Sequence, residues 1–302
     1  MLEFSDAAAI KIANEYLDHP NRYRSEHDET ARAVVTKTTI MLAKIAHSVS
    51  VNALEKKEAE FVLQLVTDPR VLKPATVVKK PDEAVYVATI ALAFVESLFD
   101  RVVAMADLPP GKFDPGAFVA FASITAIGHE FSHGIYGHCE VGTNDKQELY
   151  WQELDADRRS GSGSFVVVND RDVRRMMADF FGIRDNIDLL EVAIFSQSLL
   201  AFSLSGTTSA IYANSALRSF LYFDGLRSVV LLKMFANPLE IEYARKNADR
   251  LAEAARECVP GGAEIVEIRS KHDEQEKLWR ETLKAEVFAF ADRMIARSRF
   301  RE

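Results

Sequence analysis

Residues 117–133 read AFVAFASITAIGHEFSH, and this stretch organises the rest of the chain. Its first part, 117–128, carries no charge, which is typical of a helix that is buried on every side. We predict that this helix runs over about 116–136 and carries His129 and His133 four positions apart. Positions four apart lie one above the other on a helix, so both imidazoles can face one ion. Glu130 is rotated by about 100° from His129, which places its carboxylate beside such an ion.

A second helix, predicted over about 146–160, supplies acidic residues on one face. Glu153 can reach inward from it as a third metal ligand. Asp157, one turn later, can accept the free N–H of a ligating histidine and so fix its tautomer. Two imidazoles and one carboxylate form a ligand set that catalytic zinc sites use, with a fourth position left open. We therefore expect Zn²⁺ as the cofactor and Glu130 as the general base toward water.

These two helices carry a family resemblance. The pattern H-E-x-x-H at 129–133, followed by a helix with E-x-x-x-D, resembles the gluzincin zinc metallopeptidases. The form E-x-x-A-D, made by Glu153, Ala156 and Asp157, is similar to that of the membrane-bound heat-shock and CAAX-prenyl peptidases, whose membrane helices are absent here. The resemblance covers about 117–160 of the 302 residues. It implies a zincin-like helical active-site core and a zinc-dependent endopeptidase that cleaves a protein or peptide substrate.

A more distant resemblance is to the soluble phage-exclusion peptidases of the Lit type, and it rests on the H-E-x-x-H motif and chain size alone. Other metal sites fit the sequence less well. A three-histidine metzincin needs H-E-x-x-H-x-x-G-x-x-H, and here Gly137 comes one position late and His138 one early. We expect His138 to be partly exposed at a helix end and not on the metal. A di-iron site needs a second Glu-x-x-His, which the chain lacks. Cys139 is expected to be a small buried residue and not an inhibitory ligand.

Peptide hydrolysis also needs a hydrogen-bond donor to the developing oxyanion, and the sequence leaves the identity of that donor open. Tyr212 and Arg218 lie in a segment rich in small residues that can approach the metal, and we favour them over His272. Two other functions stay open beside the peptidase. One is a catalytically silent metal-binding regulatory or toxin-like protein, and the other is a zinc hydrolase of a non-peptide amide.

Composition narrows the class of protein. The net charge of −8 argues against a nucleic-acid partner, because nucleic-acid binders carry a basic footprint. The two cysteines, Cys139 and Cys258, cannot make a disulfide framework, so a reducing, cytoplasmic compartment fits best. The N-terminus lacks the features of a signal peptide, and no apolar stretch reaches the ~20 residues of a membrane span. The substrate and the oligomeric state are left open.

The predicted fold is mainly α with at most a small β element. Asn144 or Asp145 can cap the second helix and Gly161 can end it, before a flexible break at 160–164 and a short strand at 165–168. The remaining helices are expected over 3–18, 25–48, 51–67, 83–107, 170–181, 187–205, 208–234, 238–257 and 263–298, with a strand or extended linker at 71–80. We expect one domain over 1–302, with an active-site core at about 83–235 on which the helices of 1–70 and 238–302 pack.

Overall fold

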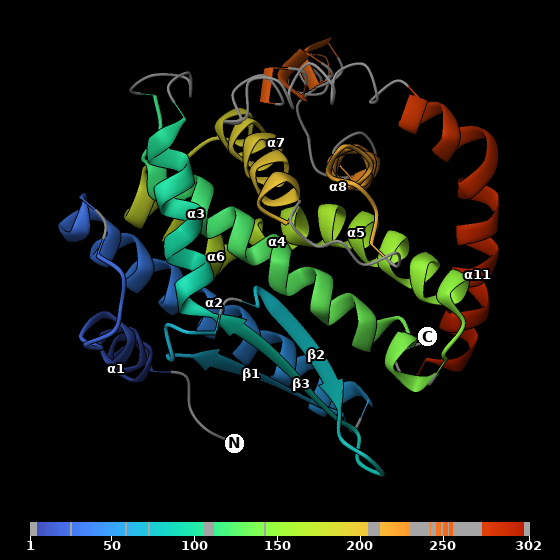
Figure 1. Ribbon diagram of the computed structural model, residues 1–302, viewed down its shortest axis with the longest axis horizontal. Helices are drawn as coiled ribbons and strands as arrows, with labels where there is room; N and C mark the ends of the chain where they lie inside the picture. Colours follow the sequence, from blue (N-terminus) through green and yellow to red (C-terminus); the bar gives the residue numbers. More distant parts are fainter. Residues whose placement is uncertain are drawn as a thin grey trace.

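The protein is mainly α-helical with one small sheet, as predicted (Figure 1). The computed structural model describes residues 5–24, 26–57, 59–71, 73–105, 112–141, 143–204, 212–229 and 274–298, together with 242, 246–248, 250–252 and 254–255. The elements are α1 (Asp6–Leu17), α2 (Asp28–Lys57), β1 (Glu60–Val66), β2 (Ala75–Lys79), β3 (Val85–Ala91), α3 (Leu92–Ala104), α4 (Pro115–Ile135), the 3₁₀ turn η1 (His138–Glu140), α5 (Lys146–Val168), α6 (Arg171–Phe181), α7 (Asn186–Ser203), α8 (Ser215–Val229), the π-helical turn η3 (Trp279–Leu283) and α11 (Lys284–Arg297).

The three strands form a sheet in the order β1-β3-β2, with β1 parallel and β2 antiparallel to β3. The strand predicted within 71–80 is confirmed as β2. The helix predicted over 51–67 is wrong, because α2 continues to Lys57 and the chain then forms β1. The helix predicted over 83–107 is wrong in its first half, which forms β3. Alternate residues of β3, such as Tyr86 and Ala88, are buried, so this apolar run has the two-residue period of a strand.

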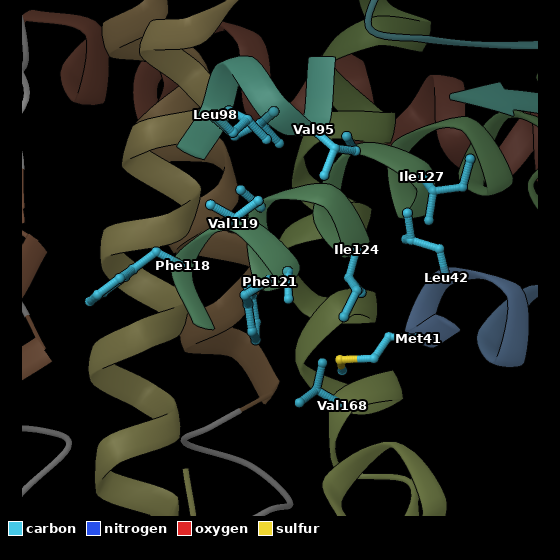
Figure 2. Packing of buried hydrophobic residues seen from close by; sticks show 14 of the residues in the cluster. Met41, Leu42, Val95, Leu98, Phe118, Val119, Phe121, Ile124, Ile127 and Val168 are labelled. Carbon is cyan, nitrogen blue, oxygen red and sulfur yellow. The ribbon is translucent and has the colours of Figure 1, made fainter. Parts of the chain in front are cut away.

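Helix α4 lies at the centre of the fold and confirms the helix predicted over 116–136. Asp114 caps its start by accepting a hydrogen bond from the Gly116 N–H, and Pro115 occupies the first turn, where a missing N–H costs nothing. The uncharged residues that follow are buried on all sides. Figure 2 shows side chains of α2, α3 and α5 gathered around those of α4, for example Met41, Val95 and Val168.

Helix α5 corrects three predictions made for 160–168. Asp145 caps it as expected, but Gly161 does not end it, the predicted break at 160–164 is helical, and the strand predicted at 165–168 is its last turn. The glycine serves contact between helices instead. A Cβ on Gly161 would lie 2.1 Å from the carbonyl oxygen of Tyr222 in α8, and one on Gly225 would lie 1.9 Å from that of Arg158. Both glycines therefore let the backbones of α5 and α8 touch.

Helix α11 packs against α5 at the right of the molecule in Figure 1, and its end reaches the turn that follows α4. Ser298 donates a hydrogen bond to the Ile135 carbonyl, and a Cβ on Gly137 would lie 2.7 Å from the Met294 carbonyl. Gly137 has φ +84°, a conformation that glycine adopts without strain, and it turns the chain from α4 into η1.

The helices predicted over 170–181, 187–205 and 208–234 correspond to α6, α7 and α8. The helix predicted over 238–257 and the first part of that over 263–298 lie largely outside the described residues, as do Cys258 and His272. Among the helices that are described, none is long and apolar enough to cross a bilayer. The single-domain organisation stays a prediction.

Candidate metal centre

His129 and His133 project from the same face of α4, because they are separated by four helical positions. Both side chains are buried, and their Nε2 atoms lie 3.1 Å apart. The two rings are inclined by 70°, so the two nitrogens converge while the rings stay apart. This convergence is what two ligands of one ion require.

Glu153 of α5 completes the group from the opposite side. Its Oε2 atom lies 3.2 Å from His129 Nε2, and its Oε1 atom lies 3.6 Å from His133 Nε2. Around a tetrahedral ion at about 2.0–2.1 Å from its ligands, neighbouring ligand atoms are roughly 3.3–3.4 Å apart. Within the described part of the chain no donor hydrogen-bonds to the buried Glu153 Oε2. The residues therefore fit a bound metal ion, and His129, His133 and Glu153 can hold it.

Asp157 and Arg218 support the first of these histidines. Asp157 Oδ1 lies 2.9 Å from His129 Nδ1, the ring nitrogen that faces away from the other ligands. Arg218 of α8 donates two hydrogen bonds to the same carboxylate, through Nε at 3.0 Å and through its terminal nitrogen at 2.8 Å. Burial opposes ionisation of Asp157, but the charges of Arg218 and His129 outweigh it and lower the Asp157 pKa. The lowered pKa favours a charged Asp157 carboxylate behind the candidate ligand His129.

Glu130 lies beside the ligands and lines the same cavity, which has a volume of about 340 Å³. Burial raises the pKa of Glu130 to about 7, and the nearby Glu153 carboxylate adds to the effect. The charges of His129, Lys73 and Arg218 act in the opposite direction. A dication held by the three ligands would also lower this pKa, because it favours the carboxylate form. Glu130 therefore lies at the cavity beside the candidate ligands, with a carboxyl group whose protonation is sensitive to a bound cation.

The pKa values of the two candidate ligand histidines are shifted in opposite directions. Burial disfavours the charge on His129, but Asp157 and Glu153 outweigh it and raise the His129 pKa to about 10. Burial lowers the His133 pKa well below its usual value, and the charges of His129 and His138 lower it further. The raised pKa favours a second ring proton on His129 when no metal is bound, and a metal ion that binds at Nε2 would have to displace it.

The cavity opens between α4, α5 and the strand β2. Ala75, Thr76 and Val77 line it from the strand, and Tyr212 lines it from the segment that precedes α8. Arg218 also borders it. Both oxyanion-donor candidates are therefore at the cavity, but the Arg218 guanidinium is bound to Asp157, whereas Tyr212 is half-buried at the wall.

Two residues beside this centre, Asp155 and Arg159, were not predicted from the sequence. His138 was expected to be partly exposed at a helix end, and that expectation is wrong, because its side chain is buried. His138 Nδ1 lies 3.0 Å from His133 Nδ1, and His138 Nε2 lies 3.2 Å from Asp155 Oδ2. Arg159 donates to Asp155 Oδ2 at 2.6 Å. A charged pair four positions apart on α5 is the one local signal, and it is also typical of a solvated helix face.

Cys139 lies at the cavity wall and is partly buried, and no hydrogen bond from its thiol to the ligands is found among the described residues. Burial raises its pKa to about 12, with a smaller contribution from the Glu130 and Glu140 carboxylates. A thiol in this state is a poor metal ligand, because thiolate is the coordinating form.

Comparisons with known proteins do not assign the chain to a family. No protein-family model, no curated protein and no solved structure matches the chain. The gluzincin resemblance of residues 117–160 therefore stays a prediction from local sequence. What the geometry adds is that the predicted ligands, which lie on two different helices, meet at one point.

Proposed function

We propose that the protein is a zinc-dependent endopeptidase whose metal is held by His129, His133 and Glu153. The observation that carries the proposal is the position of Glu153, which meets the two histidines from a separate helix while Glu130 lies beside them in one cavity. Two imidazoles and one carboxylate are typical of catalytic zinc sites, in which a fourth position is left for water or substrate. Structural zinc sites, in contrast, use four protein ligands.

When bound, the zinc ion would supply Lewis-acid polarisation of a carbonyl group and make a neighbouring water more acidic. The protein's own contribution begins with Glu130, which accepts the proton of the attacking water and later delivers it to the leaving amine. The Glu130 pKa of about 7 belongs to the metal-free centre, and a bound dication would lower it, which favours the carboxylate form that a general base needs. Asp157 holds His129 in the orientation that ligation requires.

We assign the two donor candidates to different roles. Arg218 is a positioning residue, because both of its hydrogen bonds hold the Asp157 carboxylate. Tyr212 is the proposed donor to the oxyanion. Burial raises the Tyr212 pKa, and the Glu153 and Glu130 carboxylates add to the shift. The phenol thus keeps its proton, which a hydrogen-bond donor must have.

The strand at the cavity supports a peptide as the substrate. Strand β2 pairs with β3 along one edge only, in the sheet that the described residues form. An extended peptide can add to such an edge through main-chain hydrogen bonds, which would carry its backbone past the metal ligands.

The test begins with metal analysis of the purified protein, where we expect one zinc per chain and none in Glu153→Ala. Cleavage is then followed with a library of unlabelled peptides by mass spectrometry. Glu130→Gln should keep the zinc and lower cleavage by about 10²–10⁴-fold, the usual contribution of a general base. Glu286→Gln, at an exposed position in the first turn of α11, is the matched control and should change neither.

The outcomes separate the remaining functions. A wild-type protein without bound metal would refute the proposal at its first step. Zinc binding without cleavage of any peptide would favour the silent regulatory or toxin-like protein. Zinc-dependent hydrolysis of small amides, with no cleavage of peptides, would favour the non-peptide hydrolase.

A further inference from the structure

His138 occupies the space behind the second ligand histidine. It opens η1, directly after Gly137 turns the chain away from α4. Its side chain is buried, with Nδ1 3.0 Å from His133 Nδ1 and Nε2 3.2 Å from Asp155 Oδ2. Arg159 donates to the same Asp155 oxygen. Four side chains thus form a continuous series of hydrogen bonds, which starts at the proposed metal ligand His133 and ends in the ion pair of Asp155 and Arg159.

Metal ligation determines where each hydrogen in this series lies. His133 turns Nε2 toward the other ligands, so its neutral ring carries the hydrogen on Nδ1. That N–H donates to His138 Nδ1, which must then be the acceptor. A neutral imidazole has one donor and one acceptor, so His138 carries its own hydrogen on Nε2 and donates it to Asp155. Every link has one donor and one acceptor, and no nitrogen is left unsatisfied.

We propose that His138 is a positioning residue that fixes the tautomer and orientation of His133, and that Asp155 and Arg159 hold His138 in place. This inference rests on the metal site of the proposed function. The other ligand histidine offers a comparison. Behind His129 the partners are Asp157 and Arg218, so both ligands are backed by a carboxylate that is paired with an arginine.

The ring of His138 is also held from outside the centre. Phe290 of α11 packs against it, with ring centroids 6.0 Å apart and planes inclined by 44°. Phe290 contacts Trp151 of α5 as well, at 5.9 Å, so the C-terminal helix covers the chain of hydrogen bonds. A ring enclosed in this way cannot turn away from His133 without moving α11.

Two substitutions separate hydrogen bonding from packing. His138→Phe keeps a planar ring of similar size but loses both hydrogen bonds. His138→Gln keeps an acceptor and a donor at the end of the side chain and can restore both. Loss of such an outer partner costs about 10–100-fold in metal affinity. We expect His138→Phe to bind Zn²⁺ about 10–100-fold more weakly than wild type and His138→Gln to remain closer to wild type.

Affinity is measured by competition with a chromophoric chelator, and the His133 Nδ1–H is followed by ¹⁵N–¹H correlation spectra of the zinc-loaded protein. The spectrum of His138→Phe should lose or shift that resonance, which a purely structural change elsewhere would leave in place. His27→Phe, at an exposed position ahead of α2, is the control and should match wild type. Circular dichroism of the metal-free variants checks that each is folded.

If His138→Phe folds and binds zinc as tightly as wild type, the inference is wrong. If it does not fold, Asp155→Asn decides, because it preserves volume and removes the charge that pairs with Arg159. Unchanged affinity in that variant would overturn the inference. If the wild-type protein binds no zinc, both proposals are refuted. If Glu130→Gln cleaves peptides as fast as wild type, only the peptidase proposal is refuted, because the role of His138 is tested by zinc affinity and not by cleavage.

Discussion

Gly161→Ala tests the close contact between α5 and α8 on which the centre depends. The added Cβ would lie 2.1 Å from the Tyr222 carbonyl oxygen, whereas real Cβ atoms stay beyond 3.0 Å from such neighbours. The obstacle is backbone, so one helix has to move by nearly an ångström. Such overpacking costs about 1–3 kcal/mol, and the higher helix propensity of alanine offsets up to ~1 kcal/mol of it. We expect a net loss of about 1–2 kcal/mol in the free energy of unfolding.

The matched control lies two residues away on the same helix. Around Gly163 an added Cβ meets no atom within 4 Å, so Gly163→Ala should gain about 0.5–1 kcal/mol from helix propensity alone. Urea denaturation followed by circular dichroism gives both values, and the expected result is a difference in sign. Gly225→Ala, whose Cβ would lie 1.9 Å from the Arg158 carbonyl, should behave like Gly161→Ala. If Gly161→Ala is as stable as Gly163→Ala, the close contact of the two helices is refuted.

Three further predictions concern a buried ion pair, the cavity thiol and the metal. Arg22 and Glu96 are buried and hydrogen-bonded to each other, so Glu96→Leu should lower the free energy of unfolding by about 3–5 kcal/mol. The double variant with Arg22→Met should recover only part of this loss in the same urea titration, because the buried Tyr16 hydroxyl also donates to Glu96 and stays without that acceptor. Cys139 has a pKa raised to about 12, so peptide-resolved alkylation of the folded protein should accelerate about tenfold per pH unit from pH 8 to 10, and a plateau near pH 9 would contradict the raised value. Zinc at 100 times its Kd should stabilise the wild type by about 2.7 kcal/mol in thermal melts and leave Glu153→Ala unchanged, and a chelator should reverse the effect.

Local signals were enough to predict the two helices that carry the ligands. The uncharged run at 117–128, the four-residue spacing of His129 and His133 and the cap at Asp145 all lie within one helix or at its start. Each depends on neighbours along the chain, so the sequence alone contains the needed information. The same holds for β2, which the proline and β-branched residues of 71–80 indicate.

The errors come from interactions between distant residues. Strand β1 pairs with β3, as in Phe61 with Tyr86. Without knowledge of that partner, the largely apolar sequence EFVLQLV reads equally well as a helix end. The glycine and serine residues at 160–164 were expected to break α5. Gly161 instead admits the backbone of α8, and the local sequence does not show that contact. His138 and Asp155 meet only because α5 folds back along α4, and a one-dimensional pattern does not contain that contact.

Charge burial is the strongest physical argument that this centre serves a function. Asp155 and Asp157 are both almost fully buried, on nearly opposite faces of α5, which explains why each needs its own arginine. A buried ion pair costs several kcal/mol of desolvation per ion, and apolar residues of similar volume are often as stabilising or more so. A fold selected for stability alone would not place two such pairs behind adjacent histidines. Asp157 faces the Nδ1 atom of His129 directly, and Asp155 reaches that of His133 through His138. Together the two ion pairs orient both rings toward Glu153.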